Sequence, residues 1–245
     1  MTVLPAAVWS LRLRIDTRCF AARDVAAIAL QRTTALARLP LVGSLSYRAW
    51  ARNVPIVLTV EAVVRRSAIL KIALAEIETE YQVIKRAVGV RAIDRMMDIG
   101  CGHGLIDVYF YNDFNSRLHL VDIETNDEKR HDFAATGAGY ASLAQARRFL
   151  VSNGVPDDFV VTTNPNVSAV VDENLDLIIS LLSCGFHYPV AQYAQFARRA
   201  LKPGGLFIFD LRKNSGQEDF FDLFPDYQVL EEREKSQRIA AVAPP

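Results

Sequence analysis

Residues 96–104 constrain this chain more than any other segment, because they join an apolar strand to a turn rich in glycine. The turn reads Gly-x-Gly-x-Gly from Gly100 to Gly104, and Asp98 stands near the end of the strand. Alternate glycines let the backbone turn tightly and let a ligand approach closer than a Cβ would permit. A dinucleotide fingerprint would need its third glycine at Leu105 or Asp107, so the spacing disfavours it. The turn predicts a site for another nucleotide-like cofactor.

An acidic residue followed by Gly-x-Gly-x-Gly, as in residues 98–104, resembles the first motif of the class I S-adenosylmethionine-dependent methyltransferases. A second apolar run, residues 118–121, ends in Asp122, as that family requires. There the carboxylate accepts both ribose hydroxyls, and a carboxylate is a strong acceptor for a diol. The resemblance covers roughly residues 90–245 and implies S-adenosyl-L-methionine as cofactor. It implies cofactor contacts from Asp98, Gly100, Cys101, Gly102, Gly104, Asp122, Ile123, Asn164 and Ser180.

Strand-like and helix-like segments alternate after residue 90, which is typical of an α/β fold with a parallel sheet. Five strands and a C-terminal hairpin are predicted, at residues 96–99, 118–121, 159–162, 175–180, 206–209, and 227–232 with 238–242. With the resemblance, this pattern predicts a doubly wound, Rossmann-like, mostly parallel seven-stranded sheet with an antiparallel C-terminal hairpin. We expect residues 1–66 to form a helical N-terminal extension and residues 67–245 to form the methyltransferase domain.

A long amphipathic helix is predicted over residues 67–88, and Gly89 ends it. Its apolar residues recur at alternating steps of four and three, at Leu70, Leu74, Ile77, Tyr81, Ile84 and Val88. Such a stripe packs against a sheet or a neighbouring helix, or it forms the seam of a homodimer. Both alternatives stay open from the sequence.

The loop after the fourth strand, residues 181–189, carries the reactive candidates. In the family this loop faces the transferable methyl group, so the resemblance makes His187 the candidate catalytic residue and Tyr188 a candidate substrate contact. Histidine has a suitable pKa for taking a proton from a hydroxyl near neutrality, although His187 can equally order the loop without titrating. Cys184 is interpreted as a small core thiol. If His187 is not the base, His131 and Asp210 are the next candidates.

The connection between the second and third strands is longer than one helix and two turns require. The extra segment, residues 124–140, lies at the carboxyl edge of the sheet, where loops line the ligand crevice of doubly wound folds. We interpret it as an acceptor-binding lid, with His131 and Tyr140 as candidate substrate contacts. The alternative is a surface loop without a binding role.

Two short sequence segments bear on the identity of the methyl acceptor. Gly139-Tyr140 with the helix ending at residues 153–154, and residues 183–189, resemble sugar O-methyltransferases of surface-polysaccharide pathways. This resemblance implies O-methylation of a sugar or another small hydroxyl acceptor. Residues 164–166 lack the Asn-Pro-Pro-aromatic motif of adenine methylation, so we do not expect a nucleic-acid partner. An alternative from another class is a non-catalytic methyltransferase-like binding or regulatory module, because no catalytic residue is compelling.

Charge is distributed unevenly, although the formal net charge is zero. Residues 1–70 hold ten arginines and three acidic residues, a net charge of +7, so residues 71–245 carry −7. The basic part either pairs with the acidic body or contacts an anionic membrane surface. The three cysteines lie far apart and indicate neither a disulfide framework nor a metal site. With no secretory signal and no apolar run long enough to span a membrane, we expect a cytoplasmic location.

Overall fold

The computed structural model describes residues 13–32, 55–124, 141–217 and 219–245. Within these ranges one sheet contains β1 (Arg95–Ile99), β2 (Arg117–Val121), β3 (Val160–Thr163), β4 (Leu175–Ser180), β5 (Leu201–Arg212), β6 (Tyr227–Glu232) and β7 (Ser236–Val242). The strand order is β3-β2-β1-β4-β5-β7-β6. Strands β1 to β5 pair in parallel, and β7 is antiparallel to both β5 and β6. The predicted doubly wound sheet with a C-terminal hairpin is confirmed.

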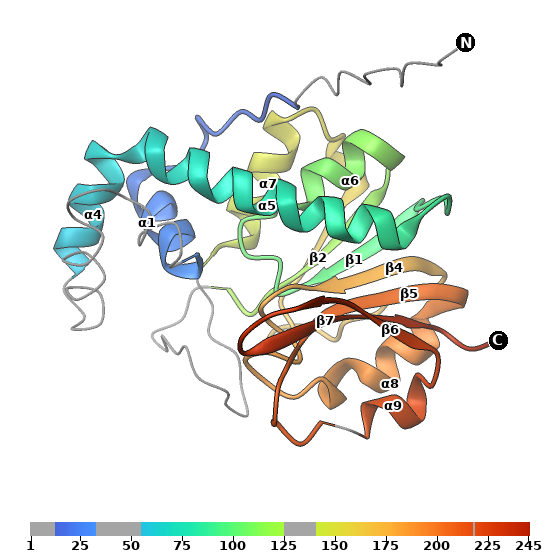
Figure 1. Ribbon diagram of the computed structural model, residues 1–245. Coiled ribbons are helices and arrows are strands. Elements are labelled where there is room, and N and C mark those ends of the chain that lie inside the picture. Colours follow the sequence, from blue (N-terminus) through green and yellow to red (C-terminus); the bar gives the residue numbers. More distant parts are fainter. Residues whose placement is uncertain (1–12, 33–54, 125–140, 218) are drawn as a thin grey trace, which may run out of the picture.

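Helices cover both faces of the sheet (Figure 1). The described helices are α1 (Ala22–Gln31), α4 (Pro55–Val64), α5 (Arg66–Val88), α6 (Asp107–Phe114), α7 (Leu143–Ser152), α8 (Ala191–Ala200), α9 (Phe220–Leu223) and a short 3-10 turn at Asp157–Phe159. Helices α5, α6 and α7 lie on one face, and α8 and α9 lie on the other. None of the helices in the described ranges combines the length and apolar character that a membrane span requires.

The central strands are largely buried on both faces, which explains their mainly apolar sequences. In β1, Met96 belongs to the core beneath α5 to α7, whereas Met97 and Ile99 belong to the core beneath α8 and α9. The chain leaves β1 toward β2 on one side, and β4 lies on the other side. In doubly wound folds, ligands bind at such a reversal of strand order, outside the carboxyl ends of the strands. The glycine turn, Asp122 and the loop after β4 all follow these strand ends.

Helix α5 packs its apolar stripe inward. The Tyr81 ring stacks on Tyr109 of α6 with centroids 5.0 Å apart and meets Phe110 edge-on at 5.1 Å. Along the stripe, Leu70, Ile77, Tyr81, Ile84 and Val88 are buried, and Leu74 packs against the same core. The stripe therefore packs against a neighbouring helix and the core that it shares with the sheet, as one of its two interpretations predicted.

The connection from β3 to β4, residues 164–174, is described throughout and contains no helix. Side chains fasten it instead. The His119 ring on β2 bridges the Asp172 carboxylate and the Thr163 hydroxyl, with both contacts at 2.8 Å. Asp172 also pairs with Arg95 on β1. His119 therefore has a structural role, because its ring joins this connection to β2 and to the end of β3.

Candidate functional site

The glycine turn after β1 is fastened to the end of β2. The Gly100 N–H donates to the Val121 carbonyl at 2.7 Å, and the Gly102 N–H donates to the Asp122 carboxylate at 2.8 Å. The φ angles of Gly100 and Gly102 are 78° and 56°, in the left-handed region that favours glycine. The second Asp122 oxygen accepts the Glu124 N–H at 3.1 Å. The structure thus brings together the two motifs that the sequence placed in one site.

Burial and hydrogen bonding have opposite effects on the pKa of the Asp122 carboxyl group. Burial raises its pKa to about 6, although the N–H groups of Gly102 and Glu124 favour the ionised form. Each carboxylate oxygen accepts one N–H and retains capacity for a further hydrogen bond. The ionised side chain can therefore accept a diol while it holds the glycine turn in place.

The turn after β4 lies directly against the glycine turn. A Cβ on Gly100 would stand 1.9 Å from the Ser183 Oγ atom, so only glycine fits beneath that side chain. The Ser183 Oγ and Tyr188 Oη atoms are 3.2 Å apart, within hydrogen-bond distance. Burial raises the pKa of Tyr188 well above its usual range, so its hydroxyl stays neutral. Sequence reasoning named Tyr188 as a candidate substrate contact but missed Ser183, because only the fold places Ser183 above Gly100.

Ser180 braces the same turn. Its hydroxyl donates to the Ile99 carbonyl at 2.8 Å and accepts the Cys184 N–H at 2.9 Å, and the residue has no exposed surface. Its observed contacts therefore join β4 to β1 and to the following turn. A contact between Ser180 and a cofactor stays a prediction.

Asn164 lies beside the end of β2, as expected for a residue that follows β3. Its amide donates to the Ile123 carbonyl at 3.3 Å and to the Glu124 carboxylate at 3.1 Å. The other Glu124 oxygen accepts the N–H of Leu143 at the start of α7. Sequence reasoning missed Glu124, which ties the turns after β2 and β3 to a helix start.

The catalytic candidates have different surroundings. His187 lies in the turn after β4, where its N–H donates to the Ser183 carbonyl at 2.8 Å and its ring meets Phe186 edge-on. Asp210 at the end of β5 is fully buried and bound to Arg238 by two hydrogen bonds of 2.9 Å. Both of its carboxylate oxygens are occupied by this guanidinium inside the core, which argues against Asp210 as the alternative base. His131 and Tyr140 lie outside the described residues.

Residues from the N-terminal part cover the glycine turn. The Phe20 ring stacks on Phe149 of α7 and meets the His103 ring edge-on at 5.5 Å. The Gln31 amide, at the end of α1, comes within 2.9 Å of the position that a Cβ on Gly102 would occupy. Burial lowers the pKa of His103 to about 4, so its ring is neutral near pH 7. No sequence motif pointed to Gln31, because the contact joins segments about seventy residues apart.

The buried thiols and carboxyls of the site are not arranged to hold a metal. Burial raises the pKa of both Cys101 and Cys184, which keeps these thiols neutral. Within the described part of the chain, no group of three or more histidine, cysteine or acidic residues has metal-binding geometry. Cys184 is fully buried, in agreement with its interpretation as a core thiol.

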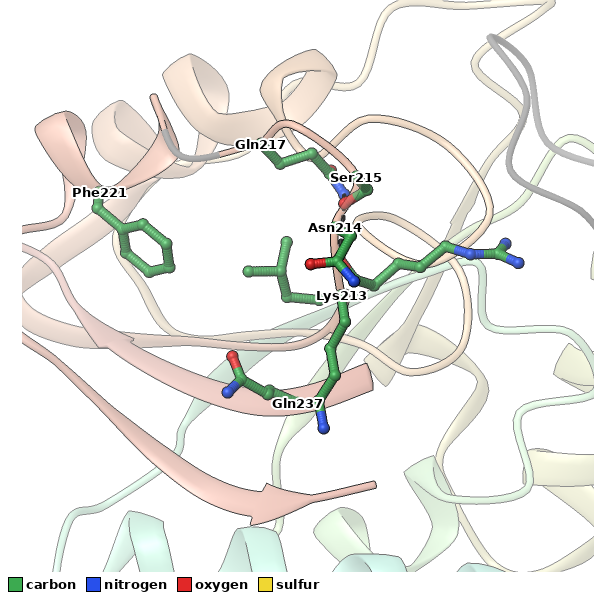
Figure 2. A pocket seen from close by; sticks show the side chains of 8 residues that line it. Lys213, Asn214, Ser215, Gln217, Phe221 and Gln237 are labelled. Atoms are coloured by element: carbon green, nitrogen blue, oxygen red, sulfur yellow. Dashed lines mark hydrogen bonds between the residues drawn. The ribbon is translucent and has the colours of Figure 1, made fainter. Parts of the chain in front are cut away.

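A pocket of about 340 Å³ opens beside the end of β5. Figure 2 shows Phe221 on one side of it, Asn214 and Ser215 on the other, and Lys213 and Gln237 at the lower edge of the view. The rim is fastened to the turn that carries His187. Gln217 donates to the Gly185 carbonyl at 2.9 Å and accepts the Val190 N–H at 2.7 Å. The sequence contained no motif for this pocket.

No protein-family model and no curated protein matches the sequence. Among solved structures, geranyl diphosphate C-methyltransferase from Streptomyces coelicolor A3(2) matches 68% of this chain and 76% of its own, with 13% identity and a TM-score of 0.50. A candidate O-methyltransferase from Nostoc punctiforme matches 67% of this chain with 18% identity and a TM-score of 0.47. The 16S rRNA N2 G1207 methyltransferase of T. thermophilus matches 65%, with 15% identity and a TM-score of 0.46. These matches span only 55% and 41% of the Nostoc and T. thermophilus chains.

The chain therefore has the class I S-adenosylmethionine-dependent methyltransferase fold, as the glycine turn and Asp122 predicted. At these identities the likeness defines the fold alone, and it leaves the acceptor open.

Proposed function

We propose that this chain is an S-adenosylmethionine-dependent methyltransferase that methylates a hydroxyl group of a sugar or another small hydroxylated acceptor. The observation that carries the proposal is the hydrogen bond from the Gly102 N–H to the Asp122 carboxylate. It holds a strong diol acceptor beside the glycine turn. The Streptomyces enzyme with this fold is in complex with S-adenosyl-L-homocysteine, which supports the choice of cofactor.

The proposed mechanism relies mainly on positioning. The cofactor, when bound, would supply a methyl group attached to a sulfonium, and the neutral thioether that remains is a good leaving group. The protein then has to align the acceptor oxygen and exclude water, and orientation of this kind contributes about 7 to 11 kcal/mol. In this proposal Ser183 and Tyr188 orient the acceptor above Gly100. His187, in the same turn, accepts the proton of the hydroxyl group.

The pocket beside β5 supports a hydroxylated acceptor. Its lining combines the amides of Asn214 and Gln237 and the Ser215 hydroxyl with the aromatic ring of Phe221. Amide and hydroxyl groups match the polar edges of a sugar, and an aromatic ring matches its apolar face. We propose that part of the acceptor occupies this pocket, next to the turn that carries His187.

The alternative is a non-catalytic module that uses the same site to bind a nucleotide-like ligand. The surroundings of two candidate reactive groups favour this alternative. Asp210 forms a buried ion pair, and Cys184 is buried as a neutral thiol, so neither is available for catalysis. Catalytic turnover with any acceptor would exclude this alternative.

The experiment that tests the proposed function measures release of S-adenosyl-L-homocysteine over a panel of sugars, nucleotide sugars and glycolipids. We expect turnover with at least one member, and we expect Gln237→Ala to raise the KM for that acceptor. Gln228→Ala, an exposed glutamine on β6, is the matched control and should leave the KM unchanged. Cofactor binding without turnover on any hydroxylated acceptor would favour the binding module.

A further inference from the structure

Asp107 is a buried acid for which the proposed function has no role. It lies in the first turn of α6, and the residue has no exposed surface. Among the described residues, no group donates a hydrogen bond of good geometry to either carboxylate oxygen. Its Oδ2 atom lies 3.6 Å from the position that a Cβ on Gly104 would occupy, at the back of the glycine turn. A buried ionised carboxylate without a donor is costly, so this side chain needs a proton or a cation.

Asp107 contacts Asp98, the acidic residue that precedes the glycine turn. The two carboxyl groups are within hydrogen-bonding contact, and Asp98 is only 4% exposed. Burial is the main cause that raises the pKa of both carboxyls, and for Asp98 the charge of Asp107 adds to it. In a site of low polarity, two carboxyl groups in contact do not both ionise unless a cation offsets their charge.

Among the described residues, none of the groups around this pair supplies a compensating positive charge. Asp122 at the end of β2 adds a further negative charge, and the Cys101 thiol of the glycine turn is neutral. From α7 the neighbours at Gly104 are the apolar side chains of Ala146 and Leu150. The His103 ring, also in the glycine turn, is neutral near pH 7. A proton shared between the two carboxyls is therefore the available way to satisfy Asp107.

We infer that Asp98 and Asp107 share a proton in the cofactor-free protein and that binding of the cationic cofactor displaces this proton into the solvent. The inference rests on the proposed function, because S-adenosylmethionine supplies the positive charge, through its ammonium and sulfonium groups, that replaces the proton. The hydrogen bond between the carboxyls breaks, and both become carboxylates. Asp107 is then a positioning residue that sets the charge of Asp98 without facing the ligand itself.

This exchange makes cofactor affinity depend on pH. Where binding releases one proton, the dissociation constant falls about tenfold for each unit that the pH rises. The dependence ends once the pair is already ionised in the cofactor-free protein. Weak binding in acid and tight binding in mild alkali are therefore expected from this pair.

Calorimetric titration with S-adenosylmethionine tests the inference at pH 7 in two buffers of different ionisation enthalpy. The difference in apparent heat between the buffers gives the number of protons released. We expect roughly one proton for each cofactor bound by the wild type and roughly none for Asp107→Asn, which keeps a donor for Asp98 but cannot share a proton. Asp113→Asn is the matched control on the same helix. Its carboxylate is held ionised by Lys85 and Tyr81, so this variant should release as many protons as the wild type.

Infrared difference spectroscopy of the wild type gives a second readout that does not depend on the folding of any variant. The carbonyl stretch of a protonated carboxylic acid should be present at pH 7 and should disappear when cofactor is added. Binding without proton release and without this spectral change would overturn the shared proton and leave the proposed function standing. Absence of any cofactor binding would overturn both.

Discussion

Asp210 at the end of β5 holds the Arg238 guanidinium of β7 with two hydrogen bonds of 2.9 Å, and neither side chain is exposed. The same carboxylate accepts the N–H of Leu182 at 3.0 Å, where the backbone has a φ of 51°. A leucine in this left-handed conformation is strained, and the hydrogen bond offsets part of that cost. Asp210 therefore shapes the turn that carries Ser183 and His187. Its carboxylate is occupied by these structural contacts.

Arg238→Met should destabilise the protein by about 3 to 5 kcal/mol, because it leaves the Asp210 carboxylate buried without its cation. Urea denaturation followed by circular dichroism measures the change. Arg199→Met, an exposed arginine on α8, is the control and should change stability by less than about 0.5 kcal/mol. Adding Asp210→Asn to Arg238→Met should recover part of the loss. Equal effects of Arg238→Met and Arg199→Met would contradict the role given to the pair.

Gly100→Ala should abolish the close contact between the two turns, because its Cβ would stand 1.9 Å from the Ser183 Oγ atom. The φ angle of 78° adds about 1 to 2 kcal/mol of strain. Gly154→Ala, at a φ of 90° and with nothing within 4 Å, isolates the cost of the backbone conformation. In thermal denaturation Gly100→Ala should lose more stability than Gly154→Ala, and Ser183→Gly should restore part of the difference. Failure of Ser183→Gly to restore any stability would argue against this contact.

Cofactor affinity should also respond to pH through Asp122. Burial raises the pKa of Asp122 to about 6, because it favours the neutral form. The folded protein therefore loses stability toward unfolding as the pH rises from the usual carboxyl range to 6. The ionised form is the better acceptor for the ribose diol, so affinity should increase as the pH rises through 6. Asp122→Asn should bind more weakly and lose the part of the pH profile centred near 6. An unchanged profile in that variant would assign this titration to another group.

His187→Ala should lower kcat by about 10² to 10⁴, while cofactor affinity stays within twofold of the wild type, if His187 is the general base. His187→Asn should be equally impaired, since an amide can donate or accept a hydrogen bond but cannot take the proton. Steady-state kinetics with the acceptor found in the panel, together with calorimetry, separates the two effects. Near-normal turnover of His187→Asn would make His187 a positioning residue.

Much of the fold follows from local sequence patterns. The predicted strand at residues 175–180 coincides with β4, because the apolar run at residues 177–179, bounded by polar residues, has few alternatives in a parallel sheet. Strand β5 begins at Leu201 and not at residue 206. The turn-like Lys202-Pro-Gly-Gly205 segment is incorporated because Leu201 pairs with Leu175 across an irregularity in register. Local propensity cannot reveal pairing of this kind.

The candidate site also has one part that the sequence predicts and one part that it does not. The glycine turn and Asp122 are motifs at strand ends, so the topology that the sequence predicts brings them together. The contacts of Ser183 with Gly100, of Gln31 with Gly102 and of Asp107 with Asp98 depend on how loops and helices pack. Such contacts carry no periodic signal, and they became visible only in the structure.

Calorimetric titration of the wild type and of Asp122→Ala with S-adenosyl-L-homocysteine tests the central claim most directly, because it asks whether the glycine turn and Asp122 form a cofactor site. Loss of a hydrogen bond to a charged group costs about 1.5 to 3 kcal/mol, so affinity should fall by about one to two orders of magnitude. Asp157→Ala, an exposed acid at the amino end of β3, should bind like the wild type. No binding by the wild type, or equal affinity for Asp122→Ala and the wild type, would contradict the account.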